Sequence, residues 1–242
     1  MNNKILEQLK NGLIVSCQAL ENEPLHSPYI MSKMALAAKE GGAVGIRANS
    51  VVDIKAIKEV VDLPVIGLIK KDYPNSGIFI TPTMKEIKEL IESGVEIIAL
   101  DATLRTQADG VSLEEKLKYI HDNNTLAMAD ISTYEEGMNA AKLGFDLIST
   151  TLSGYTNYST NGKGPDVELV ERLVKDTKDY KSLIVAEGKI FSEDDLKSIL
   201  EAKPFAVVIG SAITRPQVIT ARYNEIVKSF NLNLCERKPN VK

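Results

Sequence analysis

Two spacings of apolar residues alternate along nearly the whole chain. Short apolar runs, typical of buried parallel strands, are each followed by a stretch with apolar residues three and four positions apart, which is typical of a helix. The strand-like runs cover residues 13–16, 43–48, 64–70, 96–100, 126–129, 145–149, 183–186 and 206–209. The helical patterns cover residues 28–39, 52–60, 83–93, 113–121, 133–144, 166–177, 192–202 and 216–230. The pattern therefore predicts eight successive β/α units.

Eight β/α units in 242 residues predict an α/β fold, a (β/α)8 TIM barrel, because one such barrel commonly takes about 250 residues. We expect a single domain over residues 1–242, with a helical cap over 1–12 and a polar tail over 231–242. An open, doubly wound sheet shares this alternation. It is disfavoured because no G-x-G-x-x-G sequence follows the first strand and because eight units fill a barrel without remainder.

Local signals agree with these boundaries. Thr83 with Glu86, and Thr133 with Glu136, have the spacing of a capping box at a helix start. The glycine-rich stretch 154–165 follows the sixth strand. It is either a surface loop or a lid over a site, since loops of this kind serve both purposes.

Composition narrows the class of protein. Apolar residues make up 44% and charged residues 26%, as in ordinary globular proteins, and the net charge of −4 argues against nucleic-acid binding. No apolar run approaches the roughly 20 residues of a membrane helix, and we expect no signal peptide. Cys17 and Cys235 suit neither a metal site nor a disulfide framework, so we expect a cytoplasmic protein. The oligomeric state stays open, with a homodimer as one option.

Polar residues gather where the predicted strands end. In a barrel, the carboxyl ends of the strands build the active site. These positions hold a lysine, an arginine, carboxylates and small polar residues, namely Ser16–Gln18, Arg47, Lys70, Asp101, Asp130, Thr150–Thr151, Glu187 and Gly210–Ser211.

Lys70 and Glu187 are the candidate catalytic residues. Burial and nearby positive charge would lower the pKa of Lys70 and make a neutral amine available as a base or nucleophile. The alternative, an ammonium that reaches solvent, fits the adjacent Lys71 better. Glu187 can move a proton, or it can be an ion-pair partner.

The remaining strand-end groups are two aspartates, a glutamine and an arginine. Asp130 is favoured as a site residue because Ser132 and Thr133 already offer helix caps, whereas Asp101 is equally suited to either role. Gln18 and Arg47 carry planar donor groups suited to hydroxyls, an amide or an oxyanion.

The two histidines lie away from the strand ends. His26 falls in the first β/α loop, where it borders the site or is merely part of the loop. His121 falls late in a helix, and we expect it to be structural.

Glycine turns follow the seventh and eighth strands, at the positions where these barrels frequently bind phosphate. Gly188 and Gly210 let backbone N–H groups approach an anion, and Ser211 follows directly. Arg215 is placed to add charge-assisted hydrogen bonds. Together they predict a phosphate site.

In this order, these residues resemble the N-acetylmannosamine-6-phosphate 2-epimerase family of sialic-acid degradation. The resemblance spans residues 13 to about 222. The stretches that carry it are IVSCQALENEPLHSPYIMSKMALAAKEGGAVGIRA, LPVIGLIKKDY, FITPT, IALDAT, MADIST, LGFDLISTTLSGYT, VAEGKI and VIGSAITRPQ. Residues 158–165 and the tail after Phe230 follow no family pattern.

The resemblance implies an isomerase that epimerises N-acetylmannosamine 6-phosphate to N-acetylglucosamine 6-phosphate at C2, with no cofactor and no metal. It places the family's catalytic lysine at Lys70 and its acidic partner at Glu187. It places the substrate contacts at Gln18, Arg47, Asp130 and Arg215.

Two other classes of protein stay open at this point. One is another phosphosugar enzyme on a barrel, such as an isomerase or an aldolase that uses Lys70 as a Schiff-base amine. The other is a non-catalytic phosphosugar sensor, which Lys70 and Glu187 argue against, because pure binding does not need a base beside an acid.

Overall fold

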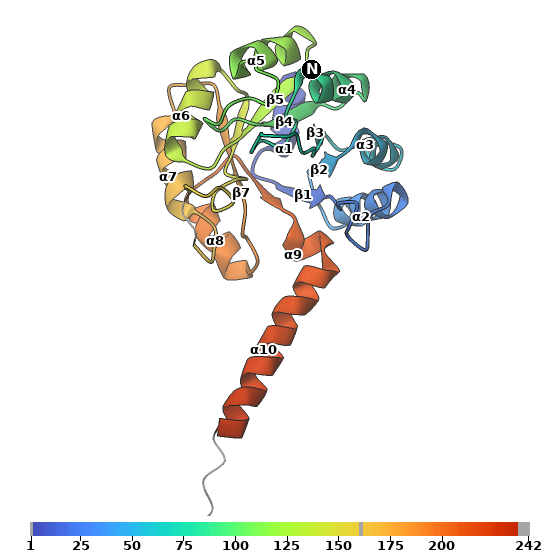
Figure 1. The fold of residues 1–242 in the computed structure, drawn as a ribbon, viewed down its shortest axis with the longest axis vertical. Coiled ribbons are helices and arrows are strands. Elements are labelled where there is room, and N and C mark those ends of the chain that lie inside the picture. The colour runs from blue at the N-terminus through green and yellow to red at the C-terminus, as the bar shows by residue number, and fades with distance from the viewer. Residues whose placement is uncertain (1, 160–161, 237–242) are drawn as a thin grey trace, which may run out of the picture.

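Eight parallel strands form the centre of this protein, whose structure is a computed structural model that describes residues 2–159 and 162–236. The strands are β1 (Leu13–Cys17), β2 (Gly45–Asn49), β3 (Val65–Leu68), β4 (Ile97–Asp101), β5 (Leu126–Asp130), β6 (Leu147–Ser149), β7 (Leu183–Glu187) and β8 (Ala206–Ile209). They pair in sequence order and close into a barrel, with Ile14 of β1 opposite Val208 of β8 (Figure 1). The predicted (β/α)8 barrel is confirmed, and the open sheet is excluded because an open sheet has two unpaired edges.

Helices follow the strands and surround the barrel (Figure 1). They are α1 (Asn2–Leu9), α2 (Pro28–Glu40), α3 (Val51–Lys58), α4 (Met84–Glu92), α5 (Leu113–Asp122), α6 (Tyr134–Leu143), α7 (Val167–Asp176), α8 (Glu193–Glu201), α9 (Ser211–Thr214) and α10 (Pro216–Glu236). Both predicted capping boxes are present, at Thr83 with Glu86 and at Thr133 with Glu136. Each satisfies backbone N–H groups that a helix start leaves without partners.

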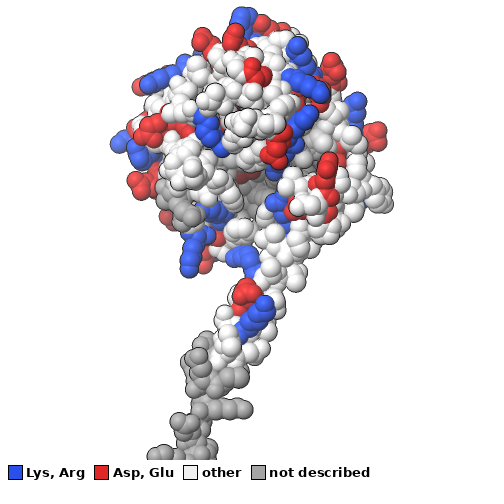
Figure 2. All heavy atoms as spheres, in the orientation of Figure 1, with Lys and Arg blue, Asp and Glu red and all other residues white. Residues whose placement is uncertain are grey.

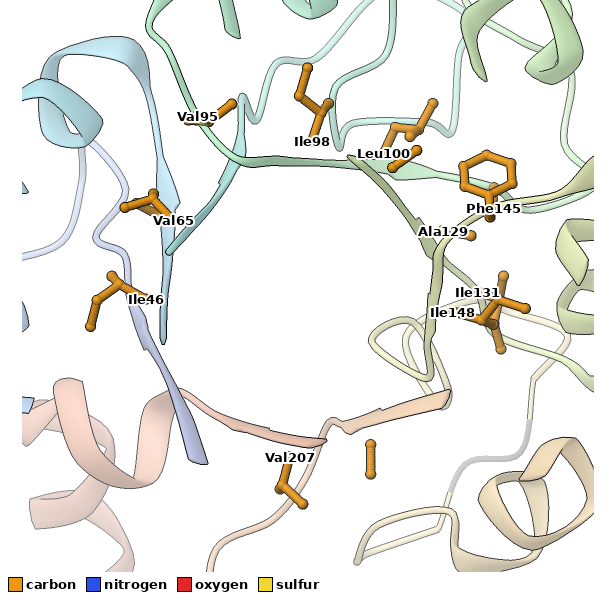
Figure 3. Packing of buried hydrophobic residues seen from close by; sticks show 14 of the residues in the cluster. Ile46, Val65, Val95, Ile98, Leu100, Ala129, Ile131, Phe145, Ile148 and Val207 are labelled. Carbon is orange, nitrogen blue, oxygen red and sulfur yellow. The ribbon is translucent and has the colours of Figure 1, made fainter. Parts of the chain in front are cut away.

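Side chains along each strand alternate between the inside and the outside of the barrel, as the two-residue period of a strand requires. Inward-facing apolar residues form one cluster, which includes Ile14, Ile66, Leu68, Ile97, Ala99, Leu126, Met128, Leu147, Val185, Ala206 and Val208. Outward-facing residues pack against the helices; Figure 3 shows Ile46, Val65, Ile98, Ala129, Ile148 and Val207 pointing away from the ring of strands. Leu9 of α1 is fully buried in the inner cluster.

The structure corrects three boundaries. Strand β3 ends at Leu68, so Lys70 lies two residues beyond it, in an isolated bridge with Ile80. The four-residue helix α9 was not expected. Helix α10 continues through Glu236 instead of ending at Phe230, because no glycine or proline interrupts the chain before Pro239. Residues 237–242 of the predicted tail lie outside the described residues.

Helix α10 leaves the barrel and projects away from it (Figure 1). Near its start, Arg222 Nη1 donates a hydrogen bond of 3.0 Å to the carbonyl of Phe191. Figure 2 shows positive and negative groups intermixed on the visible face of the barrel and few of them on this helix. None of the helices in the described part of the chain combines the length and the apolar character needed to cross a membrane.

Candidate active site

Inward-facing positions at the carboxyl ends of the strands carry the polar residues of the candidate site. In β5, Leu126 and Met128 face the barrel interior, so Asp130, two residues further on, faces it too. The same period places Arg47 of β2 and Glu187 of β7 in the interior, where they meet Asp130. Parallel strands therefore bring together three charged groups that are far apart in sequence.

A buried ion cluster forms at this level. The side chain of Arg47 is 1% exposed and that of Asp130 is 0% exposed. Arg47 donates from Nη1 to Asp130 Oδ1 at 3.0 Å and from Nη2 to Asp130 Oδ2, which makes a two-pronged ion pair. Arg47 Nη1 also donates to Glu187 Oε2 at 2.5 Å. One guanidinium thus holds two carboxylates in a fixed arrangement.

The pKa values in this cluster follow from burial and pairing. Burial raises the pKa of Glu187, and Arg47 opposes that rise without cancelling it. Burial alone would lower the pKa of Arg47, but the carboxylates of Asp130 and Glu187 outweigh it and raise the pKa. Arg47 is therefore a permanent cation, while Glu187 is a carboxyl group that takes up a proton more readily than usual.

Thr151 adds a hydroxyl to the cluster, and the sequence analysis assigned it no role. Its Oγ1 lies 2.7 Å from Asp130 Oδ1, 3.1 Å from Glu187 Oε2 and 3.0 Å from Arg47 Nη1. The two-residue period points to it, because Leu147 and Ser149 of β6 precede it on the inward face. A hydroxyl carries only one proton, so it donates to one carboxylate at a time.

Lys70 stands close to this cluster and borders the same cavity. Its backbone N–H donates to Asn49 Oδ1 at 2.8 Å, which anchors the chain just beyond β3. Burial, together with the positive charges of Arg47 and Arg215, lowers the pKa of its amine from 10.5 to about 8, against the opposing effect of Glu187 and Asp130. Lys71, by contrast, is 46% exposed and its ammonium lies 3.9 Å from Glu86. The structure separates the two adjacent lysines as expected.

A cavity of about 220 Å³ opens at this end of the barrel. Its polar lining includes Ser16, Gln18, Arg47, Lys70, Thr151, Glu187, Ser211 and Arg215. Its apolar lining includes Phe79, Ile80, Leu152, Ile190 and Val208. The lining suits a small molecule with several hydroxyl groups and at least one apolar substituent.

Two buried polar atoms at the cavity have no protein partner among the residues described. Gln18 donates from Nε2 to Ser16 Oγ at 2.8 Å, while its Oε1 accepts nothing. Arg47 Nε likewise donates to nothing. Buried polar atoms normally have partners, so these two atoms are exceptions beside the cavity.

The two predicted glycine turns border the cavity. Gly188 has φ +106°, a conformation that residues with a Cβ rarely adopt. A Cβ on Gly210 would lie 3.2 Å from Ser16 Cβ, so the close approach of β8 and β1 favours glycine there. Arg215, between α9 and α10, donates from Nη1 to Ser211 Oγ at 3.3 Å. The predicted phosphate-site residues therefore all line the cavity.

Other candidates lie outside the cavity lining. Asp101 accepts hydrogen bonds from Thr103 Oγ1 at 2.6 Å and from Arg105 Nη2 at 2.6 Å, which gives it a structural role in its own loop. His26 Nδ1 lies 3.1 Å from the carbonyl of Ala19 and does not border the cavity.

His121 and Cys17 are not among the residues that line the cavity. His121 Nε2 lies 2.9 Å from Asp146 Oδ2 at the end of α5. Cys17 is a buried free thiol whose pKa burial raises to about 12, and the side chain of Cys235 lies outside those described. Over the described ranges 2–159 and 162–236, no group of three or more His, Cys, Asp or Glu is arranged to hold a metal ion.

The described part of the glycine-rich stretch 154–165 reaches the cavity through Tyr155. Tyr155 borders the cavity, and its ring lies 5.5 Å from Lys189 Nζ. Tyr158 ties the same stretch to α6, because its hydroxyl donates to Glu136 Oε1 at 2.8 Å. Residues 160–161 lie outside the described residues, so the lid over 154–165 stays a prediction.

Comparison with known proteins identifies the family. A family profile described as "Putative N-acetylmannosamine-6-phosphate epimerase" matches residues 31–229. A Clostridioides difficile protein with the same description, as a 2-epimerase, is 54% identical over 229 residues, which cover 95% of this chain and 100% of the relative. The solved structure of the N-acetylmannosamine-6-phosphate 2-epimerase from Clostridium perfringens matches with a TM-score of 0.89 at 52% identity, covering 92% of this chain and 96% of that chain. With its closed barrel and the residues at its strand ends, this chain belongs to the N-acetylmannosamine-6-phosphate 2-epimerase family.

Proposed function

We propose that this protein interconverts N-acetylmannosamine 6-phosphate and N-acetylglucosamine 6-phosphate by inverting C2, in amino-sugar catabolism. The observation that carries the proposal is the amine of Lys70, with its pKa lowered to about 8, in one cavity with Glu187. A base and a proton donor at one site are what an epimerisation at carbon requires. Membership of the epimerase family supports the choice of substrate.

The chemistry assigns Lys70 to C2. Opening of the sugar ring places an aldehyde at C1, which makes the C2–H bond acidic. The neutral amine of Lys70 takes that proton, and the electron pair of the bond forms an enolate whose negative charge rests on the C1 oxygen. Return of a proton to the other face of C2 gives the epimer. A lysine of ordinary pKa is almost entirely protonated at neutral pH and cannot accept this proton. The lowered pKa of Lys70 leaves part of it neutral, so it suits this role.

Glu187 is assigned to the ring oxygen and the C1 hydroxyl. Opening of the ring needs a proton delivered to the ring oxygen and one removed from the C1 hydroxyl. Because the pKa of Glu187 is raised, a larger share of this group carries a proton at a given pH than of an ordinary carboxyl group, and its contact with Arg47 holds it at the cavity edge. Arg47 also stabilises negative charge that develops on the C1 oxygen.

The remaining residues bind and orient the substrate. The free Oε1 of Gln18 suits the N–H of the acetamide group. Asp130 does not border the cavity, so we assign its effect on the substrate to the ion pair with Arg47. Gly188, Gly210, Ser211 and Arg215 are assigned to the 6-phosphate, for which they offer backbone N–H groups, a hydroxyl and a guanidinium.

An NMR time course with N-acetylmannosamine 6-phosphate tests the function and the base together. We expect the purified protein to produce N-acetylglucosamine 6-phosphate, Lys70→Ala to produce none, and Lys71→Ala, the matched control, to behave as the wild type. Borohydride added with substrate separates the aldolase alternative, because only a Schiff base is trapped as a covalent adduct. Ligand binding without turnover by the wild type would instead indicate a sensor.

A homodimer is supported by the outer surface of α10. Its residues Tyr223, Ile226, Val227 and Phe230, here called the apolar stripe, are spaced for one helix face and are 57–68% exposed. Beside β1 and β8, a groove of about 350 Å³ is lined in part by Leu196, Leu200 and Val207.

We infer that the stripe of each copy covers this groove on a second copy, because the outer ring of a barrel is normally completed by the helix after its last strand. Light scattering after size exclusion tests the assembly. We expect a dimer for the wild type, a monomer for Phe230→Asp, and a dimer for Ser229→Asp, which adds the same charge outside the stripe. A monomeric wild type would remove the dimer from the proposal.

We also place the enzyme in the cytoplasm. The charged substrate does not cross a bilayer unaided, so the enzyme must lie in the compartment in which the substrate is made. The buried free thiol of Cys17 suits a reducing compartment. Activity recovered in the soluble fraction of gently lysed cells, and not released by osmotic shock, would support this placement.

A further inference from the structure

Glu23, in the loop between β1 and α2, makes the main side-chain contact to Arg215 outside the cavity. Arg215 Nη2 donates to Glu23 Oε2 at 2.9 Å, and the two side chains are 25% and 17% exposed. The pair joins the loop after β1 to the segment after β8, across the position where the barrel closes. Glu23 itself does not border the cavity, whereas Arg215 does.

The carboxylate of Glu23 is held by contacts within the protein. Its Oε2 also accepts the backbone N–H of Leu20 at 2.8 Å, and the Glu23 N–H donates back to the carbonyl of Leu20 at 2.8 Å. Its Oε1 accepts from Gln217 Nε2 of α10 at 3.1 Å. The carboxylate is thus held from two segments, so it acts as a rigid partner for the guanidinium.

We propose that Glu23 is a positioning residue for anion recognition, which holds the Arg215 guanidinium at the cavity edge in the orientation that a phosphate group needs. The inference rests on the proposed role of Arg215 at the 6-phosphate. A free arginine side chain loses much rotational freedom when it binds an anion. A side chain that is already held loses less, and the affinity rises accordingly.

The charge of Glu23 has an opposing effect that the test must separate. A carboxylate beside the guanidinium also repels a phosphate, so its removal could strengthen binding. Glu23→Gln removes the charge and keeps an oxygen that accepts from Arg215, whereas Glu23→Ala removes both. Positioning therefore predicts that alanine weakens substrate binding and that glutamine largely rescues it.

The experiment measures kcat and KM for N-acetylmannosamine 6-phosphate, and the inhibition constant of inorganic phosphate, for five variants. These are Glu23→Ala, Glu23→Gln, Arg215→Ala, the double variant Glu23→Ala with Arg215→Ala, and the control Glu21→Ala, an exposed glutamate of the same loop. We expect Glu23→Ala to raise KM and the phosphate inhibition constant roughly three- to tenfold, the effect of ordering one long side chain, with kcat within about twofold. Glu23→Gln should stay within about twofold of the wild type, and Glu21→Ala should not differ from it.

The double variant decides whether Glu23 acts through Arg215. We expect it to match Arg215→Ala, because a residue that only positions another has no effect once that other is gone. An equal loss from Glu23→Ala in both backgrounds, or a lower KM for both Glu23 variants, would overturn the inference and leave the phosphate assignment standing. An unchanged KM for Arg215→Ala would instead overturn the phosphate assignment and the inference with it. If Glu23→Ala does not fold, Glu23→Asp, which withdraws the carboxylate from Arg215, must raise KM in its place.

Discussion

The lowered pKa of Lys70 predicts a defined dependence of activity on pH. Burial, with the positive charges of Arg47 and Arg215, lowers this pKa from 10.5 to about 8. At pH 7, a lysine of pKa about 8 is neutral in roughly one molecule in ten, against roughly one in 3,000 for an ordinary lysine. The surroundings thus enrich the neutral amine on the order of 300-fold. Because a rising pH removes the proton, kcat/KM should rise about fivefold from pH 7 to pH 8 and level off above about pH 9.

The assay is kcat/KM for the phosphorylated substrate from pH 6 to pH 10. This ratio reports groups of the free enzyme, the state in which the cavity holds no substrate. The phosphate of the substrate titrates near pH 6, so the rise of kcat/KM with pH must be read from about pH 7 upward. Lys71→Ala is the control and should keep the wild-type profile. Arg215→Ala removes one of the cations that lower the pKa, so its midpoint should move upward, toward 10.5.

Three results would refute this reasoning. A flat profile between pH 7 and pH 8 would show that no group with a pKa near 8 controls the reaction. Substantial activity in Lys70→Arg would exclude Lys70 as the base, because a guanidinium stays protonated throughout this range. A midpoint that falls in Arg215→Ala would contradict the electrostatic origin of the shift.

Four further predictions follow from the same site. Glu187→Gln should lower kcat about 10²–10⁴-fold with a much smaller change in KM, measured by steady-state kinetics beside calorimetric binding; normal turnover would remove Glu187 from the mechanism. Arg215→Ala should lower kcat/KM roughly tenfold or more for the phosphorylated sugar and far less for N-acetylmannosamine, and equal losses would show that it does not read the phosphate. Turnover in deuterated water should place deuterium at C2 of the product, seen by NMR, whereas complete retention of the original hydrogen would argue against exchange with an amine. Arg47→Ala should destabilise the fold by about 3–5 kcal/mol in urea denaturation, because Asp130 is left buried without its counter-ion; an unchanged midpoint would contradict the buried ion pair.

The barrel and most of the site could be predicted because both depend on short-range periodicity. Apolar runs and helical spacing are local properties, and a closed barrel is the arrangement that eight such units complete. The strand ends then locate Arg47, Lys70, Asp130 and Glu187 without any knowledge of their contacts. The two-residue period separates Lys70 from Lys71, since Leu68 faces inward and Lys70 follows it by two.

Contacts between distant segments could not be predicted in the same way. Arg47 and Glu187 are 140 positions apart, and Arg215 and Glu23 are 192 apart, so no local spacing relates either pair. The sequence marks Thr151 only as a strand-end residue, because a threonine hydroxyl carries no charge that would indicate a partner for carboxylates. The course of α10 is a further case, because the pattern predicts a helix but not the surface that covers its apolar stripe.

The two carboxylates beside Arg47 differ in their exposure and in their contacts with the guanidinium. Asp130 is fully buried, meets both terminal nitrogens of the guanidinium and accepts from Thr151, so its charge is fully used in holding Arg47. Glu187 is 13% exposed, borders the cavity and meets only one of those nitrogens, and burial raises its pKa. Glu187 therefore borders the cavity as a carboxyl group that takes up a proton more readily than an ordinary one. We therefore expect Asp130 to hold the guanidinium of Arg47 in place and Glu187 to exchange protons with the sugar.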